Sequence, residues 1–483
     1  MSAMKTILLP LLALAITASC QTIQNCEKAS RHNIAQLKKL SQQYVRSSYA
    51  NGIFIGYDKN EVTLFDLEGH VFLKGDYSVV PQSNSDLLMI RTDSLIGFMN
   101  RNGDLVLPLE FDPTGECACH IGRLFEGDGI YTLCRKGKYG VVDSAGNIIV
   151  PFVHDHHFWL DRSRRWMFSP ISSGDKYKME VQSVDGKVKI GPYNNITGPF
   201  YNYFLISNDD NLMGCIDTNG NVLLDCRYEG IVNVGEGRLA LKENGKWSLF
   251  HLRTGRRSYL RIPNIEFHEW VPQHSPLIVC DTVDSNKKHH YYGAIDTNGN
   301  VVIPFLHEDM DAFYYRDYLI IQDFGGKSFV YNGYKGQLLK RFDALTVEYS
   351  EDVVSWDLPF LAVCQDSLWG IVDSNFNMVL PPTYHSLYIL DRHHAVATLA
   401  NGENALIDFQ GHILFQGPFN DFVEIDDGLY SFGCSNPDKY TESIVGYCDR
   451  WGNSTITRKE LRQARQWEKR RQEKNRERKT NKR

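Results

Sequence analysis

The sequence predicts an all-β protein built from about eleven copies of one antiparallel β-meander. A phrase recurs along the chain: "YYGAIDTNGNVVIPFLHED" begins at Tyr291, "MGCIDTNGNVLLDCRYEG" at Met213 and "YGVVDSAGNIIVPFVHD" at Tyr139. In each copy, two short β-branched runs flank a polar turn, which is a hairpin signal. A glycine marks the turn at intervals of 34 to 44 residues where it recurs in successive units. Fixed periods of 20–50 residues indicate propellers, solenoids or arrays.

The turn glycine is the most regular feature of the repeat. Because the residue before it varies and includes the β-branched Thr254, a type I turn with positive φ only at the glycine fits better than a type I′ turn. One unit has Phe376-Asn377 in this slot, and asparagine is the next best residue for the left-handed conformation. The predicted structural glycines are Gly69, Gly103, Gly146, Gly186, Gly220, Gly255, Gly299, Gly336, Gly411 and Gly452.

Each unit offers three or four short strands, and no helical periodicity appears inside it. A second glycine precedes the hairpin in many units, as in Tyr139-Gly140 and Trp369-Gly370. A β-propeller is the preferred architecture, because a propeller blade is a meander of this length. Eleven blades exceed the usual four to eight, so two smaller propellers or an open superhelical stack remain alternatives to one large propeller.

The units "SLWGIVDSNFNMVLPPTYHSL", "KYGVVDSAGNIIVPF" and "YGAIDTNGNVVIPF" resemble those of bacterial WG-repeat (KWG-repeat) proteins. The pattern of that family is roughly Trp-Gly-aromatic-Ile-Asp-x-x-Gly-x-x-Val-Ile-Pro. The resemblance covers about residues 60–456 and is most specific in the units at 139, 213, 292 and 368; the literal pair is kept at Trp369-Gly370. It implies an all-β repeat fold and usually no enzymatic activity.

The segment before the repeats predicts export. Residues 1–19 read as a signal peptide, with Lys5 ahead of an apolar stretch from Ile7 to Ile16 that is too short to span a membrane. The sequence Thr17-Ala18-Ser19-Cys20 resembles a bacterial lipobox, which implies a lipid on Cys20 that holds the protein in the membrane. The expected location is the outer membrane or cell surface, and ordinary cleavage to a periplasmic protein is the alternative.

Two further segments flank the repeats, which are expected over residues 51–456. Residues 20–50 read as a linker with a short helix, which either spaces the fold from the membrane or packs on the first unit. The tail, 457–483, is strongly basic, since 13 Lys or Arg and 4 Glu follow residue 457. An apolar stripe at Leu461, Ala464 and Trp467 predicts about two helical turns, with disorder beyond.

Several roles for the tail are compatible with its charge. A solvated tail is the simplest interpretation, and docking on anionic envelope lipids or polymers is the main alternative. The tail could also fold back on its own repeats, because the whole chain carries −6 and the tail +9, which leaves −15 elsewhere. Nucleic-acid binding fits poorly with export, so no nucleic-acid partner is expected.

The cysteines and histidines give little support to a chemical site. The cysteines at 134, 280, 364 and 434 occupy one repeated strand slot, which indicates small apolar residues rather than a disulfide framework. Only Cys117 with Cys119, and Cys215 with Cys226, remain as candidate pairs. His154 and His307 stand where Phe111 and Tyr384 stand in other units, which predicts packed strand-end residues; His156, His157 and the pairs 289–290 and 393–394 are expected on exposed loops.

No motif of a known catalytic class is present, so no catalytic residue, metal or cofactor is predicted. The turn aspartates, such as Asp143 and Asp217, recur once per unit and are expected to cap the backbone. The expected function is therefore a cell-envelope-anchored binding or scaffold module for an unknown protein or glycan. Its ligand is expected on loop inserts at His156–Trp166 or Ile265–Pro276. A propeller-type hydrolase acting on envelope polysaccharide is the alternative.

Overall fold

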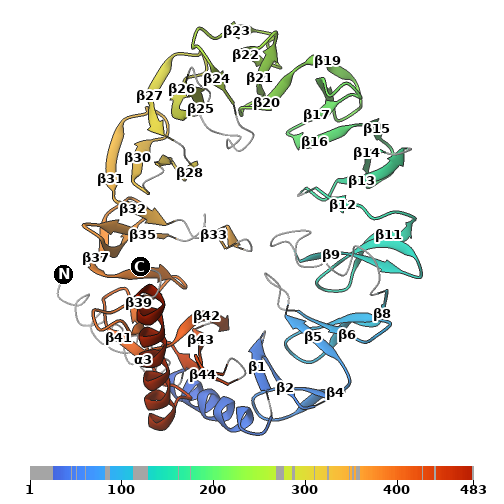
Figure 1. Cartoon of the computed structure of the whole chain (residues 1–483). Helices are drawn as coiled ribbons and strands as arrows, with labels where there is room; N and C mark the ends of the chain where they lie inside the picture. The colour runs from blue at the N-terminus through green and yellow to red at the C-terminus, as the bar shows by residue number, and fades with distance from the viewer. Residues whose placement is uncertain are drawn as a thin grey trace, which may run out of the picture. The chain divides into compact units, whose positions relative to one another are not determined.

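Besides one short two-stranded hairpin, the computed structural model contains eleven antiparallel β-sheets in the part of the chain that it describes, and they follow one another in sequence order (Figure 1). We call them blades 1 to 11. Nine blades have four described strands, and blades 3 and 11 have three. The predicted all-β fold of about eleven antiparallel units is therefore confirmed. The structure describes residues 26–480, apart from 45, 51, 60, 82–86, 113–128, 162, 174–175, 268–276, 285–288, 309–310, 324–325, 347–348, 351–352, 355–358, 427 and 440–441.

Every blade is a meander in which strands that are consecutive in the chain pair side by side, apart from the short hairpin β33–β34 that interrupts blade 9. Blades 1 to 4 contain β1 (Arg46–Ala50), β2 (Ile53–Tyr57), β3 (Val62–Phe65), β4 (Val71–Gly75); β5 (Ser78–Pro81), β6 (Leu88–Arg91), β7 (Ile96–Met99), β8 (Leu105–Phe111); β9 (Ile130–Arg135), β10 (Lys138–Asp143), β11 (Ile148–His154); and β12 (Trp159–Leu160), β13 (Trp166–Ser173), β14 (Lys176–Ser183), β15 (Lys189–Tyr193). Blades 5 to 8 contain β16 (Asn195–Phe200), β17 (Tyr203–Ser207), β18 (Met213–Asp217), β19 (Val222–Tyr228); β20 (Gly230–Asn233), β21 (Arg238–Glu243), β22 (Lys246–His251), β23 (Arg257–Tyr259); β24 (Ile265–Glu266), β25 (Ile278–Val283), β26 (His290–Ile295), β27 (Val301–Glu308); and β28 (Asp311–Tyr315), β29 (Tyr318–Gln322), β30 (Ser328–Asn332), β31 (Leu338–Phe342). Blades 9 to 11 contain β32 (Ala344–Thr346), β35 (Phe360–Gln365), β36 (Leu368–Asp373), β37 (Met378–Tyr384), with the hairpin β33 (Tyr349–Ser350) and β34 (Val353–Val354); β38 (Ser386–Ile389), β39 (His394–Thr398), β40 (Asn404–Asp408), β41 (Ile413–Gly417); and β42 (Asn420–Asp426), β43 (Leu429–Ser435), β44 (Ser443–Asp449).

The blades belong to two compact units. Unit 1 takes in the described parts of Met1–Leu109, Leu358–Ala362 and Leu368–Arg483, and unit 2 those of Glu110–Asp357 and Val363–Ser367. Blades 1, 10 and 11 lie wholly in unit 1, and blades 3 to 8 lie wholly in unit 2.

The apolar cores lie between consecutive blades. One cluster in unit 2 joins Phe168 and Val181 of blade 4 to Phe204 and Ile216 of blade 5. The same arrangement recurs between blades 5 and 6, 6 and 7, and 7 and 8. Each blade therefore covers the apolar face of its neighbour, which is the behaviour of repeat proteins whose single unit cannot bury its own core.

The second glycine of the repeat is explained by a close approach within the blade. It lies on the third strand, next to a bulge in the fourth strand, and a Cβ at Gly370 would lie 2.4 Å from the carbonyl oxygen of Leu380. Gly293 is similar, with 2.5 Å to the carbonyl oxygen of Ile303. A larger residue would therefore push the fourth strand out of register.

The hairpin glycines all have positive φ, between +65° and +96°. In blade 5, the Gly220 N–H donates to the Asp217 carbonyl at 3.0 Å, and the Asp217 carboxylate accepts from the backbone and side chain of Asn221, both at 2.8 Å. The aspartate thus caps the turn. In blade 9 the left-handed residue is Phe376, with φ +60°, and not the asparagine that propensity favours. Phe376 takes the glycine position because its N–H makes the same bond to the Asp373 carbonyl, at 2.9 Å.

Two helices accompany the described blades, and both lie in unit 1. The N-terminal helix (residues 26–41) buries Ile34, Leu37 and Leu40 against Phe54 of blade 1 and Tyr447 of blade 11. Of the two predicted roles for this segment, packing is the one observed, and the helix contacts both the first and the last blade. No helix in the described chain is both long and apolar enough to cross a membrane.

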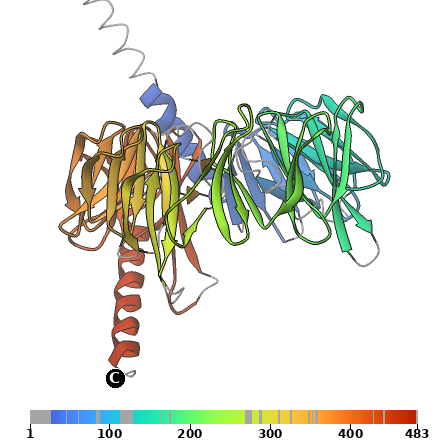
Figure 2. The same cartoon turned by 90° about the horizontal axis from the view of Figure 1, so that it is seen from above.

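The basic tail forms the second helix, α3 (Arg458–Thr480). It begins with a capping box, in which Thr457 and Glu460 exchange hydrogen bonds of 2.6–3.1 Å. Ala464 and Trp467 are buried in the core of blades 10 and 11. The helix continues to Thr480 and extends beyond the blades (Figure 2). The predicted disorder after Trp467 is therefore wrong, because ion pairs such as Arg470–Asp438 and Lys474–Asp438 extend the docking past the apolar stripe.

Candidate binding surface

Two adjoining hollows open on one edge of blades 4 to 6, all within unit 2. We call it the glycine-turn edge, because the turns between strands one and two and between strands three and four of each blade meet there. The first hollow, of about 630 Å³, lies between blades 5 and 6. The second, of about 610 Å³, lies between blades 4 and 5. Both are lined by Tyr201 and Asn202, so the turn from β16 to β17 forms a ridge between them.

A repeated backbone hydrogen bond fixes the turns that frame the hollows. In blade 5, the Thr218 N–H donates to the Asn202 carbonyl at 3.0 Å and so ties the glycine turn to the first turn of the blade. The equivalent bonds run from Val184 to Arg165 in blade 4 and from Leu252 to Gly237 in blade 6, both at 2.9 Å. The side chains on these turns are therefore held on a rigid frame before any ligand arrives.

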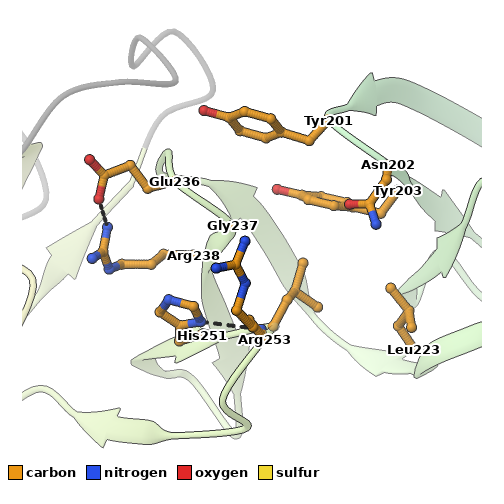
Figure 3. A pocket seen from close by; sticks show the side chains of 10 residues that line it. Tyr201, Asn202, Tyr203, Leu223, Glu236, Gly237, Arg238, His251 and Arg253 are labelled. Carbon is orange, nitrogen blue, oxygen red and sulfur yellow. Dashed lines mark hydrogen bonds and ion pairs between the residues drawn. The ribbon is translucent and has the colours of Figure 1, made fainter.

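The first hollow has an aromatic wall and a basic wall (Figure 3). Tyr201 and Tyr203 come from blade 5, and Arg238 and Arg253 from blade 6. Tyr203 is buried and its hydroxyl donates to the Asn233 side chain at 3.0 Å; burial raises the pKa of Tyr203 well above its ordinary value, so it stays neutral. The ring of Tyr201, which is 44% exposed, stands at the mouth.

The basic wall owes its shape to a longer glycine turn. The Gly255 N–H donates to the carbonyl of His251, four residues earlier, whereas the equivalent bond in blade 5 spans three residues. The extra residue lies in the stretch that carries Arg253. The Arg253 N–H donates to His251 Nδ1 at 3.2 Å, which places the proton of the neutral imidazole on Nε2. Figure 3 shows the Arg253 side chain between Arg238 and Tyr203.

The second hollow, like the first, is lined by cationic side chains and by asparagine amides. Arg164 and Arg165 come from the first turn of blade 4, Lys187 from its glycine turn, and Thr218 and Asn219 from the glycine turn of blade 5. Together the two hollows are lined by five Arg or Lys side chains and two carboxylates. The surface is therefore locally basic, although the chain outside the tail carries −15, from −6 in total and +9 in the tail.

A third hollow, of about 860 Å³, opens on the opposite edge, between blades 6 and 7. Two carboxylates, Glu266 and Asp284, line it. Glu266 accepts from Lys242 at 2.9 and 3.0 Å and from the Trp247 indole at 2.9 Å. His290 lines the same hollow, and its Nδ1 lies 2.5 Å from a carboxylate oxygen of the fully buried Asp281. The hollow thus contains an oriented imidazole near a fixed carboxylate.

The two loop inserts that were expected to carry the ligand bury their described Phe residues and Trp166. Phe158 and Trp166 are 1% and 6% exposed, because they join the cores on either side of blade 4. Ile265 and Phe267 are buried between blades 6 and 7. Arg164 and Arg165 of the first insert do line a hollow. Residues 268–276 of the second insert lie outside the described residues.

The histidines divide between core and surface. His307 is buried, and its Nε2 lies 2.7 Å from the Tyr331 hydroxyl; burial lowers the pKa of His307. His154 is half-buried against Phe158, and burial lowers its pKa as well. Both therefore pack as predicted. His394, expected on an exposed loop, is instead buried beside Asp391 and Tyr430, because it begins the second strand of blade 10.

The cysteines of the repeated slot, at 134, 280, 364 and 434, are buried free thiols. Cys215 and Cys226 are also free, and Cys215 pairs across the hairpin with Leu224 rather than with Cys226; burial raises the pKa of Cys215 to about 12. Cys117, Cys119 and the predicted lipidation site Cys20 lie outside the described residues. Within the described ranges, no group of three His, Cys, Asp or Glu side chains is placed to hold a metal ion.

Apart from Arg164, Arg165 and Trp166, which lie in a predicted loop insert, the residues of the double hollow were missed by the sequence patterns. Tyr201 lies in a turn between strands one and two, which varies in length and composition from blade to blade. Its left-handed backbone conformation, with φ +58°, could not be predicted from the sequence, because bulky residues such as tyrosine rarely adopt positive φ. The run "RTGRR" from Arg253 was the one available indication of a basic edge on blade 6.

Comparison with known proteins supports the repeat assignment. The family model described as "WG containing repeat" matches residues 96–112, 213–247, 292–327 and 369–389. The unit at Tyr139, where the resemblance is also strong, lies outside these matches. None of the curated proteins compared with the chain matches it in sequence.

The chain is similar to several solved structures, at low sequence identity and low TM-score. A crystal structure of "the eukaryotic initiation factor" is 11% identical over 76% of this chain and 94% of that one, with a TM-score of 0.42. BamB from Moraxella catarrhalis is 12% identical over 60% and 88%, with a TM-score of 0.24. The Dos1 propeller is 10% identical over 53% and 82%, with a TM-score of 0.29. The four repeat matches support the interpretation of the chain as a WG-repeat protein.

Proposed function

We propose that the protein is a binding module of the cell envelope that holds a protein or glycan on the double hollow of blades 4 to 6. The observation that carries the proposal is the shared Tyr201–Asn202 ridge, flanked by two hollows and fixed by the repeated turn-to-turn hydrogen bonds. A concave surface with convergent polar groups on a rigid frame is the usual form of a ligand site.

The envelope location is part of the proposal and rests on the sequence. The signal-peptide pattern of residues 1–19 and the lipobox-like sequence before Cys20 support export and anchoring to the outer membrane or cell surface. Labelling cells with a fatty-acid probe tests this directly. The wild type should incorporate the probe, and Cys20→Ser should not; incorporation by Cys20→Ser would refute anchoring through this residue.

Hydrogen exchange measured with and without purified envelope fractions tests the binding surface. Sacculi, outer-membrane vesicles and soluble periplasmic proteins would be added separately to the protein. At least one fraction should slow exchange in the turns at Tyr201–Asn202 and Leu252–Arg253. Tyr201→Ala should abolish that protection, whereas Tyr177→Ala, which changes a 77% exposed tyrosine elsewhere on blade 4, should leave it intact. Unchanged exchange at both turns with all fractions would contradict the proposal.

A polysaccharide hydrolase is the second candidate, and the third hollow is the observation that favours it. Glu266 and Asp284 both line this hollow, and a glycosidase needs two carboxylates flanking the bond it cleaves. The Asp281–His290 pair supplies an oriented base nearby. Release of reducing ends from envelope polysaccharide tests the idea. Activity that survives in Glu266→Gln, or no activity in the wild type, would exclude a hydrolase at this hollow.

A further inference from the structure

We infer that the ligand of the double hollow is an anionic oligosaccharide, whose carboxylate or phosphate groups bind the basic walls while a sugar ring lies against Tyr201. This inference rests on the proposed function, because it names the ligand class of the same surface.

The first argument is the local charge. The lining contains five cationic side chains, Arg238 and Arg253 in the first hollow and Arg164, Arg165 and Lys187 in the second, and two carboxylates, Glu236 and Asp185. Arginine binds carboxylate and phosphate groups through two parallel hydrogen bonds. A local excess of positive charge attracts anions even where the rest of the chain is acidic. The charge pattern therefore favours an anionic ligand.

The second argument is that the existing ion pairs on this surface are easily exchanged. Lys187 pairs with Asp185 at 2.8 Å, but their side chains are 80% and 54% exposed. An exposed pair of this kind contributes little to stability, so a ligand anion can take over Lys187 at small cost. Arg238 pairs with Glu236 at 2.5 Å, and the arginine side chain is 19% exposed while the carboxylate is 44% exposed. The exposed carboxylate can turn to water when a ligand anion binds Arg238.

The third argument concerns the groups between the cations. Tyr201 presents an exposed aromatic ring, and the side chains of Asn202, Thr218 and Asn219 offer amide and hydroxyl groups that both donate and accept hydrogen bonds. Sugar hydroxyls also donate and accept, and an aromatic ring gives an apolar face to a ring that carries them. The ridge therefore fits a sugar between two anion-binding hollows.

An acidic peptide fits the same surface less well. Peptides usually bind either by adding a strand to an open sheet edge or by placing apolar side chains in a groove. The double hollow is framed by turns at the ends of the blades, so no strand edge is offered there. The apolar side chains of its lining, Leu223, Leu252, Trp166, Val184 and Val188, stand among five cationic side chains and do not form a purely apolar groove.

Calorimetric titration of the purified protein tests the ligand class. The probes are a uronic-acid hexamer, a phosphorylated oligosaccharide of similar length, a neutral hexasaccharide and a hexaglutamate peptide. One or both anionic sugars should bind, with an affinity that falls as salt is raised, and the stronger of the two identifies the anionic group. The neutral sugar should bind at least about tenfold more weakly, the difference expected from losing one charged hydrogen bond. The peptide keeps its carboxylates but has no sugar ring to lie against Tyr201, so it should also bind more weakly than the anionic sugars. Equal or tighter binding of the neutral sugar or the peptide would overturn the inference.

Variants place the binding on the double hollow. Arg253→Ala and Arg165→Ala should each weaken binding by about tenfold. Tyr201→Ala should also weaken binding, whereas Tyr201→Phe, which keeps the aromatic ring, should bind like the wild type. Arg316→Ala is the matched control, because Arg316 occupies an equivalent first turn on blade 8 with φ +52°. If envelope fractions protect the turns in hydrogen exchange while neither anionic sugar binds, the binding function stands and the ligand class is refuted. If neither occurs, the proposed function has failed as well.

Discussion

A Cβ placed on Gly370 would lie 2.4 Å from the carbonyl oxygen of Leu380 on the neighbouring strand. Gly370→Ala should therefore destabilise unit 1 by about 3 kcal/mol, because overpacking a site closed by backbone forces the fourth strand to move. Urea unfolding followed by tryptophan fluorescence measures the change in the free energy of unfolding.

Gly220→Ala is the comparison that separates overpacking from backbone strain. Gly220 has φ +88°, but a Cβ there would meet only the Ile190 side chain, at 3.9 Å. Its cost should be the strain of a left-handed residue alone, about 1–2 kcal/mol. A smaller loss of unfolding free energy in Gly370→Ala than in Gly220→Ala would contradict this explanation of the second glycine of the repeat.

The carboxylate of Asp391 is hydrogen-bonded by three residues, His393, His394 and Tyr430, and its removal should have a defined pH dependence. Burial opposes ionisation, but hydrogen bonds from His394, Tyr430 and the His393 N–H lower the pKa of Asp391 to about 2 from 3.8. A depressed folded-state pKa stabilises the fold above pH 3.8, and that stabilisation is lost as the pH falls through about 2. Asp391→Asn should therefore cost about 2 kcal/mol at pH 7.

Unfolding measured at a series of pH values checks this expectation. The difference between the wild type and Asp391→Asn should be constant from pH 7 to about pH 5 and should shrink as the pH approaches 2. Asp366→Asn changes an exposed turn aspartate and serves as the control. A difference that stays constant down to pH 3 would show that these hydrogen bonds do not stabilise the charge of the carboxylate.

His307 should destabilise the protein in acid. Burial lowers the pKa of His307 below 6.5, while Asp323 acts to raise it and Arg341 to lower it. The unfolded chain therefore binds the proton more readily, and stability falls as the pH drops below about 6.5. Replacing both members of the pair, in His307→Phe with Tyr331→Phe, should remove this part of the pH dependence. Tyr331→Phe alone is the control and should keep it; the same pH slope in both variants would disprove the assignment.

Much of the fold could be predicted because each repeat contains the residues that determine its glycine turn. The capping aspartate and the left-handed glycine, as in Asp217 and Gly220, are local features whose geometry is set within five residues. Phe376 shows the limit of that logic, since the hydrogen-bonded frame placed a phenylalanine where propensity favours asparagine. The extent of α3 escaped prediction because its ion pairs to Asp438 come from a distant segment. Its capping box, Thr457 to Glu460, was visible in the sequence.

The candidate site was much harder to predict than the fold. Its ridge depends on the bond from Thr218 to Asn202, which joins two turns that lie sixteen residues apart. Its charge depends on bringing Arg165 of blade 4 and Arg253 of blade 6 to either side of one turn of blade 5. Neither relationship has a pattern in the sequence, because both arise only when neighbouring blades pack. The insert His156–Trp166 was expected to carry the ligand, but Phe158 and Trp166 are buried, because apolar residues between strands more often extend the core.

The docking of α3 on blades 10 and 11 gives the last prediction. Trp467 is 5% exposed and shares a core with Cys434, while Arg465 makes two hydrogen bonds to Glu403, at 2.6 and 3.0 Å. Trp467→Ala should remove about 3–5 kcal/mol of packing. A helix at the end of the chain can detach without unfolding the blades, so the expected result is local release of α3.

The thiol of Cys434 reports that release. It is buried in the wild type, and burial raises its pKa, so it should react slowly with a thiol reagent. In Trp467→Ala the reaction should accelerate, and hydrogen exchange over Arg458–Thr480 should rise, while Cys280 in blade 7 remains protected because it is fully buried in unit 2. Lys469→Ala, on the exposed face of α3, should change neither measurement. Unaltered Cys434 reactivity in Trp467→Ala would mean that the indole does not hold the helix, and the ion pairs to Glu403 and Asp438 would then have to supply the docking on their own.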